Sequence, residues 1–264
     1  MLPYARSVNT VEALQLALEL ADTADAITME RFRAHDLEVT TKPDLTPVSE
    51  ADQAVERAIR ERITAETDHV VLGEEYGAGE NATGSKYRWI IDPIDGTKSY
   101  VRGVPIWATL IGLERSGQMI VGVASAPALG MRWWAGSGLG AFRDGERLAV
   151  SSVASLDDAQ LTFAWDTSDR FHAGGIGAKL VDLSHKCWRT RGIGDFWQHL
   201  LVAEGAFDIA IDPIVSLWDI AALIPIIRES GGRWSTVRGN TGVDADSFVT
   251  TNGLLHDAVI ASLA

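Results

Sequence analysis

The sequence predicts an α/β (α+β) protein built from two closely packed domains. The first observation is the order of its patterns, because two amphipathic helices precede a run of β segments, and strands and helices then alternate. The second is the length of 264 residues, which is enough for one large core or two medium ones. We therefore expect an N-terminal α+β domain over residues 1–150 and a C-terminal α/β domain over residues 151–264.

Two helices are expected near the start of the chain. Thr10 to Phe32 carries apolar residues at helical spacing, and Asn9 to Glu12 resembles a capping box. Glu50 to Glu66 repeats the helical spacing, and Val70 to Leu72 then reads as a short strand.

The polar stretch between these helices, Thr40 to Pro47, holds two prolines and has no helical period, which predicts a loop able to move over a site. Lys42 and Asp44 lie in this loop. They are candidates to close over a site, with a solvated loop as the alternative.

The next part of the chain is predicted to consist mainly of β-strands. Ile90 and Ile91 predict a buried strand that ends at Asp92, because Pro93 has a fixed φ and no N–H group. Further strands and turns are expected at Trp107–Leu113, Ser116-Gly117, Met119–Ser125, Met131–Ala135 and Asp144-Gly145.

The second domain is expected to begin after the linker-like stretch Ser151 to Ser155 and to alternate strand with helix. A short helix should follow Gly253, and Pro225 should kink the helix that contains it. The other elements are expected at Leu161–Ala164, Asp195–Glu204, Ala206–Ile211, Leu217–Ser230 and Phe248–Thr250.

The charge balance excludes several classes of partner. Lys and Arg number 23 against 36 Asp and Glu, and the net charge of -13 argues against a broad nucleic-acid or anionic-membrane surface. An anionic substrate would be repelled unless bound cations reversed the local field. The single cysteine, Cys187, permits no intrachain disulfide, and no signal peptide or membrane-spanning run is evident, so we expect a cytoplasmic protein.

The segment that follows the buried strand concentrates oxygen ligands. Asp92 and Asp95 supply carboxylates, Ile94 a free carbonyl and Thr97 a hydroxyl, a set that suits Mg²⁺ better than Zn²⁺ or copper. Gly96 permits close approach of the backbone to a ligand, and a short helix beginning near Thr97 would offer N–H groups to a phosphate. The alternative is an acidic turn capped by Thr97 and the glycine.

Three further acids are candidates to join this cluster. Glu74 follows a strand, while Asp52 and Asp219 lie near helix starts, three residues after Ser49 and Ser216. Because Ser-x-x-Asp before an apolar helix is also a capping box, the pattern alone leaves capping and metal binding open.

Several motifs together resemble the inositol monophosphatase family over most of the chain. The motifs are Asp44-Leu45-Thr46-Pro47-Val48-Ser49-Glu50-Ala51-Asp52, Gly73-Glu74-Glu75, Trp89-Ile90-Ile91-Asp92-Pro93-Ile94-Asp95-Gly96-Thr97, and Leu217-Trp218-Asp219-Ile220-Ala221-Ala222 before Glu229-Ser230-Gly231-Gly232. The resemblance implies a layered α-β-α-β-α sandwich of the inositol monophosphatase / fructose-1,6-bisphosphatase type and a homodimer. It also implies inhibition by Li⁺.

The resemblance further implies two or three Mg²⁺ ions per active site. They would be bound by Glu74, Asp92, Asp95, Asp219 and the carbonyl of Ile94, with Asp92 bridging two ions. A metal-activated water would attack a small-molecule phosphate ester without a covalent phosphoenzyme. The resemblance assigns catalytic roles to a second set, in which Thr97 accepts a hydrogen bond from that water and donates its own to Asp52, and Glu74 holds waters of the same ion.

The substrate follows from the residues after Gly194. Asp195, Phe196 and Trp197 stand where inositol phosphatases usually have small or hydroxylic residues, and an acid with aromatic rings suits a cationic or planar leaving group. The string resembles the histidinol-phosphate phosphatase branch, which implies that Asp195 and Asp212 pair with the ammonium and imidazole of histidinol, while Gly96 and Thr97 contact the phosphate.

Several alternatives stay open at this point. Asp195 could instead cap its helix, with Phe196 and Trp197 in the core. Lys98 makes Asp-Gly-Thr-Lys similar to phosphatases of 3'-phosphoadenosine nucleotides. Inositol or other sugar phosphates are rival substrates, and an inactive metal-binding scaffold is the rival class of protein.

Overall fold

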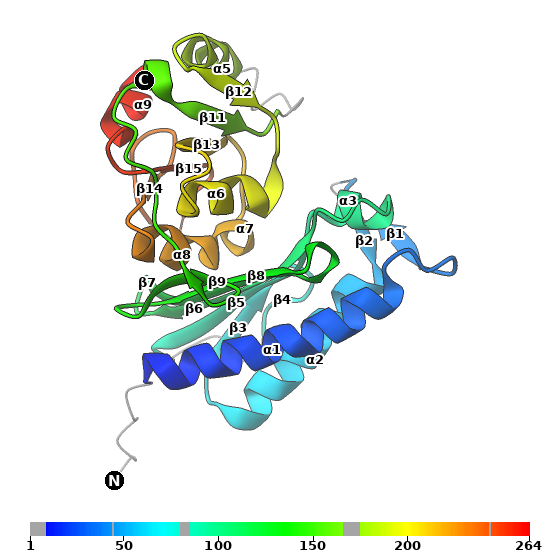
Figure 1. Cartoon of the computed structure of the whole chain (residues 1–264). Coiled ribbons are helices and arrows are strands. Elements are labelled where there is room, and N and C mark those ends of the chain that lie inside the picture. The colour runs from blue at the N-terminus through cyan, green and yellow to red at the C-terminus, as the bar shows by residue number, and fades with distance from the viewer. Residues whose placement is uncertain (1–8, 44, 80–84, 166–174, 243) are drawn as a thin grey trace.

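The computed structural model describes residues 9–43, 45–79, 85–165, 175–242 and 244–264, so the prediction for Asp44 lies outside the described residues. Figure 1 shows five layers, with helices alternating with two sheets, which confirms the predicted α-β-α-β-α sandwich. From the bottom of the view, the helix layers contain α1 (Thr10–Arg31) and α2 (Glu50–Glu66), then α6 (Asp195–Ala203), α7 (Leu217–Ala221) and α8 (Leu223–Glu229), and finally α5 (Ile176–Ser184) and α9 (His256–Leu263).

The large sheet has eight strands within the described residues. Only β3 and β5 run parallel among its neighbouring pairs, and the rest are antiparallel. In spatial order its strands are β10 (Glu146–Arg147), β9 (Gly140–Arg143), β8 (Met131–Gly136), β7 (Gln118–Ala126), β6 (Ala108–Arg115), β5 (Tyr87–Asp95), β3 (Val70–Gly73) and β4 (Gly77–Ala78).

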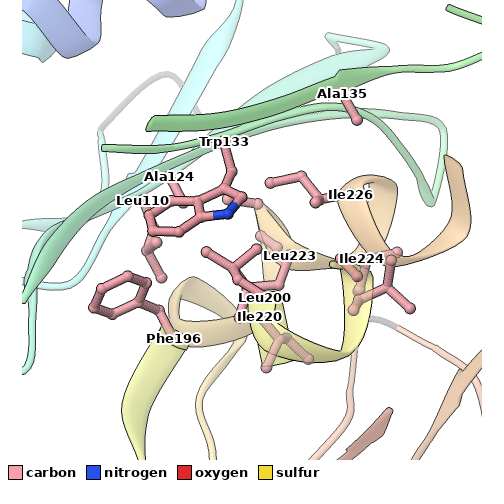
Figure 2. Close-up of a cluster of buried hydrophobic side chains, with 14 of the residues drawn as sticks. Leu110, Ala124, Trp133, Ala135, Phe196, Leu200, Ile220, Leu223, Ile224 and Ile226 are labelled. Atoms are coloured by element: carbon pink, nitrogen blue, oxygen red, sulfur yellow. The ribbon is translucent and has the colours of Figure 1, made fainter. Parts of the chain in front are cut away.

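One face of this sheet packs on α1 and α2 because their apolar residues recur at helical spacing. Asn9 caps α1 by accepting the N–H of Val11 at 3.0 Å. The opposite face packs on α6, α7 and α8, and Figure 2 shows Trp133 of β8 lying against side chains from these helices. Burial of both faces explains why the central strands are almost continuously apolar.

One segment that was expected to be a loop contains parts of two short strands. Thr40 to Pro47 is not wholly a loop, because β1 (Val39–Thr41) and β2 (Pro47–Ser49) pair as an antiparallel hairpin. Each strand has only three residues and β1 is exposed throughout, so no alternation of apolar residues marked it. Pro47 is tolerated because it is the first residue of its strand.

The prediction that the buried strand ends at Asp92 is also wrong, because β5 continues through Pro93 to Asp95. Its register against β6 shifts between Asp92 and Asp95, so Pro93 lies in an irregularity where its missing N–H breaks no regular ladder. The carbonyl of Pro93 accepts a hydrogen bond from the Thr109 hydroxyl at 2.7 Å.

The small sheet has five strands among the described residues, and it lies between the α6–α8 layer and the α5–α9 layer (Figure 1). In spatial order they are β12 (Arg189–Arg191), β11 (Gln160–Phe163), β13 (Ile209–Asp212), β15 (Phe248–Thr251) and β14 (Arg233–Ser235). Helix α5 and strands β12 and β14 were not expected from the sequence. The division into domains at about residue 150 stays a prediction.

The helix expected over Leu217–Ser230 is instead two helices, α7 and α8, which meet at Ala222. Pro225 lies in the first turn of α8, where no intrahelical partner awaits its N–H, so the break lies before the proline. At this junction Gly122 of β7 lies so close that a Cβ atom there would be 2.0 Å from the carbonyl oxygen of Ala222. Glycine therefore lets the helix pair rest directly on the sheet.

Candidate metal centre

Three carboxylates converge where β5 ends and α7 begins. Asp92 and Asp95 come from β5 and Asp219 from α7, and one oxygen atom from each lies within 4.8 Å of the others. The bulge at Pro93 is what allows two carboxylates three residues apart on one strand to approach a common point. The convergence of these distant residues is the geometry expected of a shared cation site.

The electrostatics of this cluster fit a hard divalent cation. Asp92 is 2% exposed, and its Oδ1 atom has no hydrogen-bond partner among the described residues. Burial raises the pKa of Asp92 well above its usual range, and the carboxylates of Glu74, Asp95, Asp219 and Asp52 raise it further. Burial also raises the pKa of Asp219 to about 7. Because buried anions need compensation and all donors are oxygens, the site suits Mg²⁺ or a similar ion.

Asp95 is fixed by the second half of the chain. Its Oδ2 atom accepts the backbone N–H of Phe196, at the start of α6, at 2.8 Å. Burial raises the pKa of Asp95, and the charges of Asp195, Asp219 and Asp212 add to the effect. A carboxylate of the large sheet is therefore oriented by a helix of the neighbouring layer.

The hydroxyl of Thr97 lies between two candidate partners. Its Oγ1 atom is 3.3 Å from Asp52 Oδ1 and 2.9 Å from the carbonyl oxygen of Ile94. Asp52 is buried, and burial raises its pKa to about 6. The expected contact between Thr97 and Asp52 is present. The single Thr97 proton can serve only one of these two acceptors at a time.

Both capping boxes predicted from Ser-x-x-Asp are present. Asp52 Oδ2 accepts the backbone N–H of Ser49 at 2.9 Å, and Asp219 Oδ2 accepts that of Ser216 at 2.6 Å. The remaining carboxylate oxygens still face the cluster, since Asp52 Oδ1 meets Thr97 and Asp219 lies beside Asp92. Capping and a place at the site are thus compatible, which the sequence pattern could not decide.

Glu74 follows β3 as expected, yet it stands apart from the group of three. Its Oε1 atom is 2.7 Å from Lys42 Nζ, and the same ammonium is 2.6 Å from Glu75 Oε1. Burial works against the charge of Lys42, but its bonds to Glu74 and Glu75 prevail and raise its pKa. Lys42 therefore reaches the site from the β1–β2 hairpin, and Glu75 joins the network without having been predicted.

The predicted phosphate contacts lie beside the carboxylates. Gly96 has a φ of 84°, which favours glycine, and the short helix α3 (Thr97–Val101) begins at Thr97 as expected. A Cβ atom on Gly96 would be 3.0 Å from the carbonyl oxygen of Ile106 and 3.5 Å from Asp195 Oδ2. Glycine at this position therefore lets the turn pack closely against the backbone of Ile106.

The residues predicted to determine specificity lie in different environments. Asp195 begins α6 with a φ of 50°, and Gly194 is the cap residue, so the Asp195 side chain makes no capping bond. Burial raises the pKa of Asp195 while Lys98 lowers it. Phe196 is 1% exposed and packs in the core, as the alternative interpretation held. Asp212 ends β13, near enough to raise the pKa of Asp95.

The layered fold and the cluster of three carboxylates around buried Asp92 fit a protein that binds divalent metal ions. The sequence matches the model of the inositol monophosphatase family over residues 9–264, and the chain belongs to this family. Among the described residues, no helix combines the length and apolar character needed to cross a bilayer.

Two named proteins and one solved structure are similar to this chain over nearly its whole length. The chain is 50% identical to the histidinol-phosphatase of Mycobacterium tuberculosis, covering 95% of this chain and 97% of that protein. It is 47% identical to the histidinol-phosphatase of Streptomyces coelicolor, with 96% and 97% covered. Among solved structures, the IMPase of Thermotoga maritima superposes with a TM-score of 0.84 at 29% identity, covering 96% of each chain.

Proposed function

We propose that this protein is a Mg²⁺-dependent phosphoric monoester hydrolase that converts L-histidinol phosphate to L-histidinol and phosphate, a step of histidine biosynthesis. The observation that carries the proposal is the convergence of Asp92, Asp95 and Asp219 on a buried, uncompensated centre. High identity to two proteins named histidinol-phosphatase supports the choice of substrate.

The proposed ligands are Glu74, Asp92, Asp95, Asp219 and the carbonyl oxygen of Ile94, with two or three ions per site. Bound Mg²⁺ would neutralise phosphate oxygens, lower the pKa of the attacking water and stabilise the leaving alkoxide. The negative charges of Glu74, Asp95 and Asp219, which add to the effect of burial on the pKa of Asp92, support binding of divalent cations. Lys42 occupies only the Oε1 atom of Glu74, so Glu74 would bind the metal through Oε2, or through Oε1 once the Lys42 side chain has turned away.

The chain's own groups would then handle the proton. Thr97 would accept a hydrogen bond from the attacking water and donate its own proton to Asp52, a direction supported by the 3.3 Å contact. Asp52 is held by Ser49 and is well placed to keep Thr97 in that orientation. The N–H groups near Gly96 and Thr97, where α3 begins, would contact the phosphate.

Asp195 and Asp212 are proposed to recognise the cationic alcohol. Asp195 Oδ2 lies beside Gly96, where the phosphate would bind, and its side chain makes no capping bond. Both acids raise the pKa of Asp95, which supports a position for their charges near the proposed metal ligands. An ammonium and an imidazolium would find anionic partners there, whereas a neutral polyol would not.

The test is phosphate release with Mg²⁺ from histidinol phosphate and inositol 1-phosphate. We expect histidinol phosphate to be hydrolysed at least about tenfold faster at low concentration, because one charged hydrogen bond is worth about 1.5–3 kcal/mol. Asp195→Asn should raise the KM for histidinol phosphate but not for inositol 1-phosphate. Asp257→Asn, an exposed aspartate with 86% of its side chain accessible, is the matched control. Equal turnover of both esters would overturn the substrate assignment.

We further propose that the enzyme is a cytoplasmic homodimer. The net charge of -13 and the absence of a membrane-crossing helix among the described residues support a protein that works on a small molecule. Sedimentation equilibrium would test the dimer, with a single species of about 28.5 kDa as the contrary result.

A further inference from the structure

A buried carboxylate from α2 lies directly under the turn that carries Glu74. Glu56 is 0% exposed. Its Oε2 atom accepts the backbone N–H of Glu75 at 2.7 Å, and its Oε1 atom accepts that of Tyr76 at 3.2 Å. These are the two peptide groups that follow Glu74, so Glu56 fixes the path of the chain immediately after the proposed ligand.

Arg60, one helical turn further along α2, completes the network. Its Nε atom is 2.7 Å from Glu56 Oε1, and its Nη1 atom donates to the carbonyl oxygen of Val71 at 3.2 Å. Its Nη2 atom donates to the carbonyl oxygen of Gly77. Val71 belongs to β3 and Gly77 to β4, so one guanidinium holds both strands that flank the turn.

Gly73, the residue before Glu74, is shaped by the same carboxylate. A Cβ atom at Gly73 would be 2.1 Å from Glu56 Oε1 and 2.2 Å from its Cδ atom. Only glycine therefore allows the α2 side chain to reach beneath the turn. The contact is fixed from both sides, by the hydrogen bonds after Glu74 and by the close approach before it.

Glu74 lies close enough to the metal centre to act on it. Its Oε1 atom is 2.7 Å from Lys42 Nζ, and its negative charge raises the pKa of both Asp92 and Asp52. The Glu56–Arg60 pair itself takes no part in that centre, and burial of an ion pair is a costly way merely to stabilise a turn. A role in orienting Glu74 explains why the Glu56–Arg60 ion pair is buried at this position.

We propose that Glu56, held by Arg60, is a positioning residue that sets the orientation of Glu74 and thereby the affinity for the divalent ion that Glu74 binds. The inference rests on the proposed function of the metal centre. Positioning predicts that Glu56 matters for metal binding only while Glu74 is present. A purely structural brace would weaken the fold without this dependence.

The experiment is calorimetric titration of the full chain with Mg²⁺ in the absence of substrate. We expect Glu56→Gln to weaken binding about tenfold, the lower end of the usual effect of outer groups that orient metal ligands. Glu66→Gln, on the same helix and paired with Arg62 at the surface, is the matched control and should bind Mg²⁺ like the wild type. At saturating Mg²⁺, the KM for histidinol phosphate should be unchanged in Glu56→Gln.

A double-mutant cycle separates positioning from general stabilisation. In a Glu74→Gln background, Glu56→Gln should cause little further loss of Mg²⁺ affinity, because the group it orients is gone. Losses that add in the double variant would overturn the proposal, as would a Glu56→Gln protein that binds Mg²⁺ like the wild type.

A second variant keeps the test decisive if Glu56→Gln does not fold. Arg60→Lys retains the charge but loses the fork that joins Val71 and Gly77, and about a threefold weaker affinity is expected, less than for a direct partner. Wild-type affinity in a folded Arg60→Lys protein would overturn the proposal. If the wild-type chain itself binds no Mg²⁺, the proposed function fails and this inference fails with it, whereas failure of the variants alone leaves the function standing.

Discussion

Replacement of Asp92 by asparagine should stabilise the metal-free protein while abolishing its activity. Asp92 is 2% exposed, one of its oxygens lacks a partner among the described residues, and four acidic neighbours raise its pKa. Without metal, the ionised form is therefore a buried and repelled charge. Asparagine has nearly the same shape and removes that charge, but it is a poor ligand for a hard cation.

The magnitude follows from the burial. Leaving a buried group unsatisfied costs about 1–3 kcal/mol and more when the group is charged, so removal of the charge alone should recover an amount of this order, and each kcal/mol shifts Tm by about 2–4 °C in a chain of this size. We therefore expect Asp92→Asn to raise Tm in EDTA by roughly 2–12 °C. Loss of the proposed bridging ligand would remove several kcal/mol of transition-state stabilisation, so the rate should fall at least about a hundredfold.

The effect of pH has a definite sign. Because the pKa of Asp92 is higher in the folded protein than in the unfolded chain, protonation favours folding at low pH, and this contribution is lost as the pH rises through the folded-state pKa. The gain in Tm should therefore be larger at about pH 8 than at about pH 5.

The assay pairs thermal unfolding in EDTA with phosphate release in Mg²⁺. Asp68→Asn is the control, since 95% of that side chain is exposed and its effect on stability should stay within about 0.5 kcal/mol. A lower Tm for Asp92→Asn in EDTA, or turnover equal to that of the wild type, would refute the reasoning that the cluster is a repulsive cation site.

Three further predictions concern the scaffold. Gly122→Ala places a Cβ atom 2.0 Å from the carbonyl oxygen of Ala222 and should lower the free energy of unfolding by at least about 1–3 kcal/mol, measured by urea denaturation; an unchanged midpoint would contradict the tight packing. Trp133→Phe removes the 2.7 Å bond from the indole to Glu204 and should cost about 1–3 kcal/mol, while a neutral result would show that this bond contributes little. Burial lowers the pKa of His199 to about 3, so unfolding should become easier as the pH falls below about 6.5; between pH 7 and 5 the wild type should lose about 2 kcal/mol more than His199→Gln, and parallel losses would contradict the assignment.

The sequence predicted those elements in which local pattern and tertiary packing agree. Helices α1 and α2 have helical spacing of apolar residues, and strands β6 and β7 form long apolar runs between turn signals. The strand end at Pro93 was misjudged because a bulge, which depends on the partner strand β6, makes room for the proline. The kink predicted from Pro225 is present as a full break at Ala222, about one turn before the proline, where the apolar pattern predicted one continuous helix.

The site shows the same division. Asp92, Asp95 and Asp219 converge, which are three of the four carboxylates that the family resemblance implied, while Glu74 stands apart, and their roles as ligands stay predictions. The bonds of Lys42 to Glu74 and Glu75 join residues more than thirty positions apart, and no local sequence pattern predicts such contacts.

Asp52 and Asp219 each complete a helix cap and also face the acidic centre. A mutation at either position therefore has two effects. It removes a charge from the site and about 1 kcal/mol of support from a helix start, in proteins whose total stability is commonly about 5–15 kcal/mol. Proteins that acquire a new activity through substitutions at these two positions would therefore start from a less stable fold. At Asp195 the constraint is different, because its φ of 50° favours Asp, Asn or Gly over most other residues.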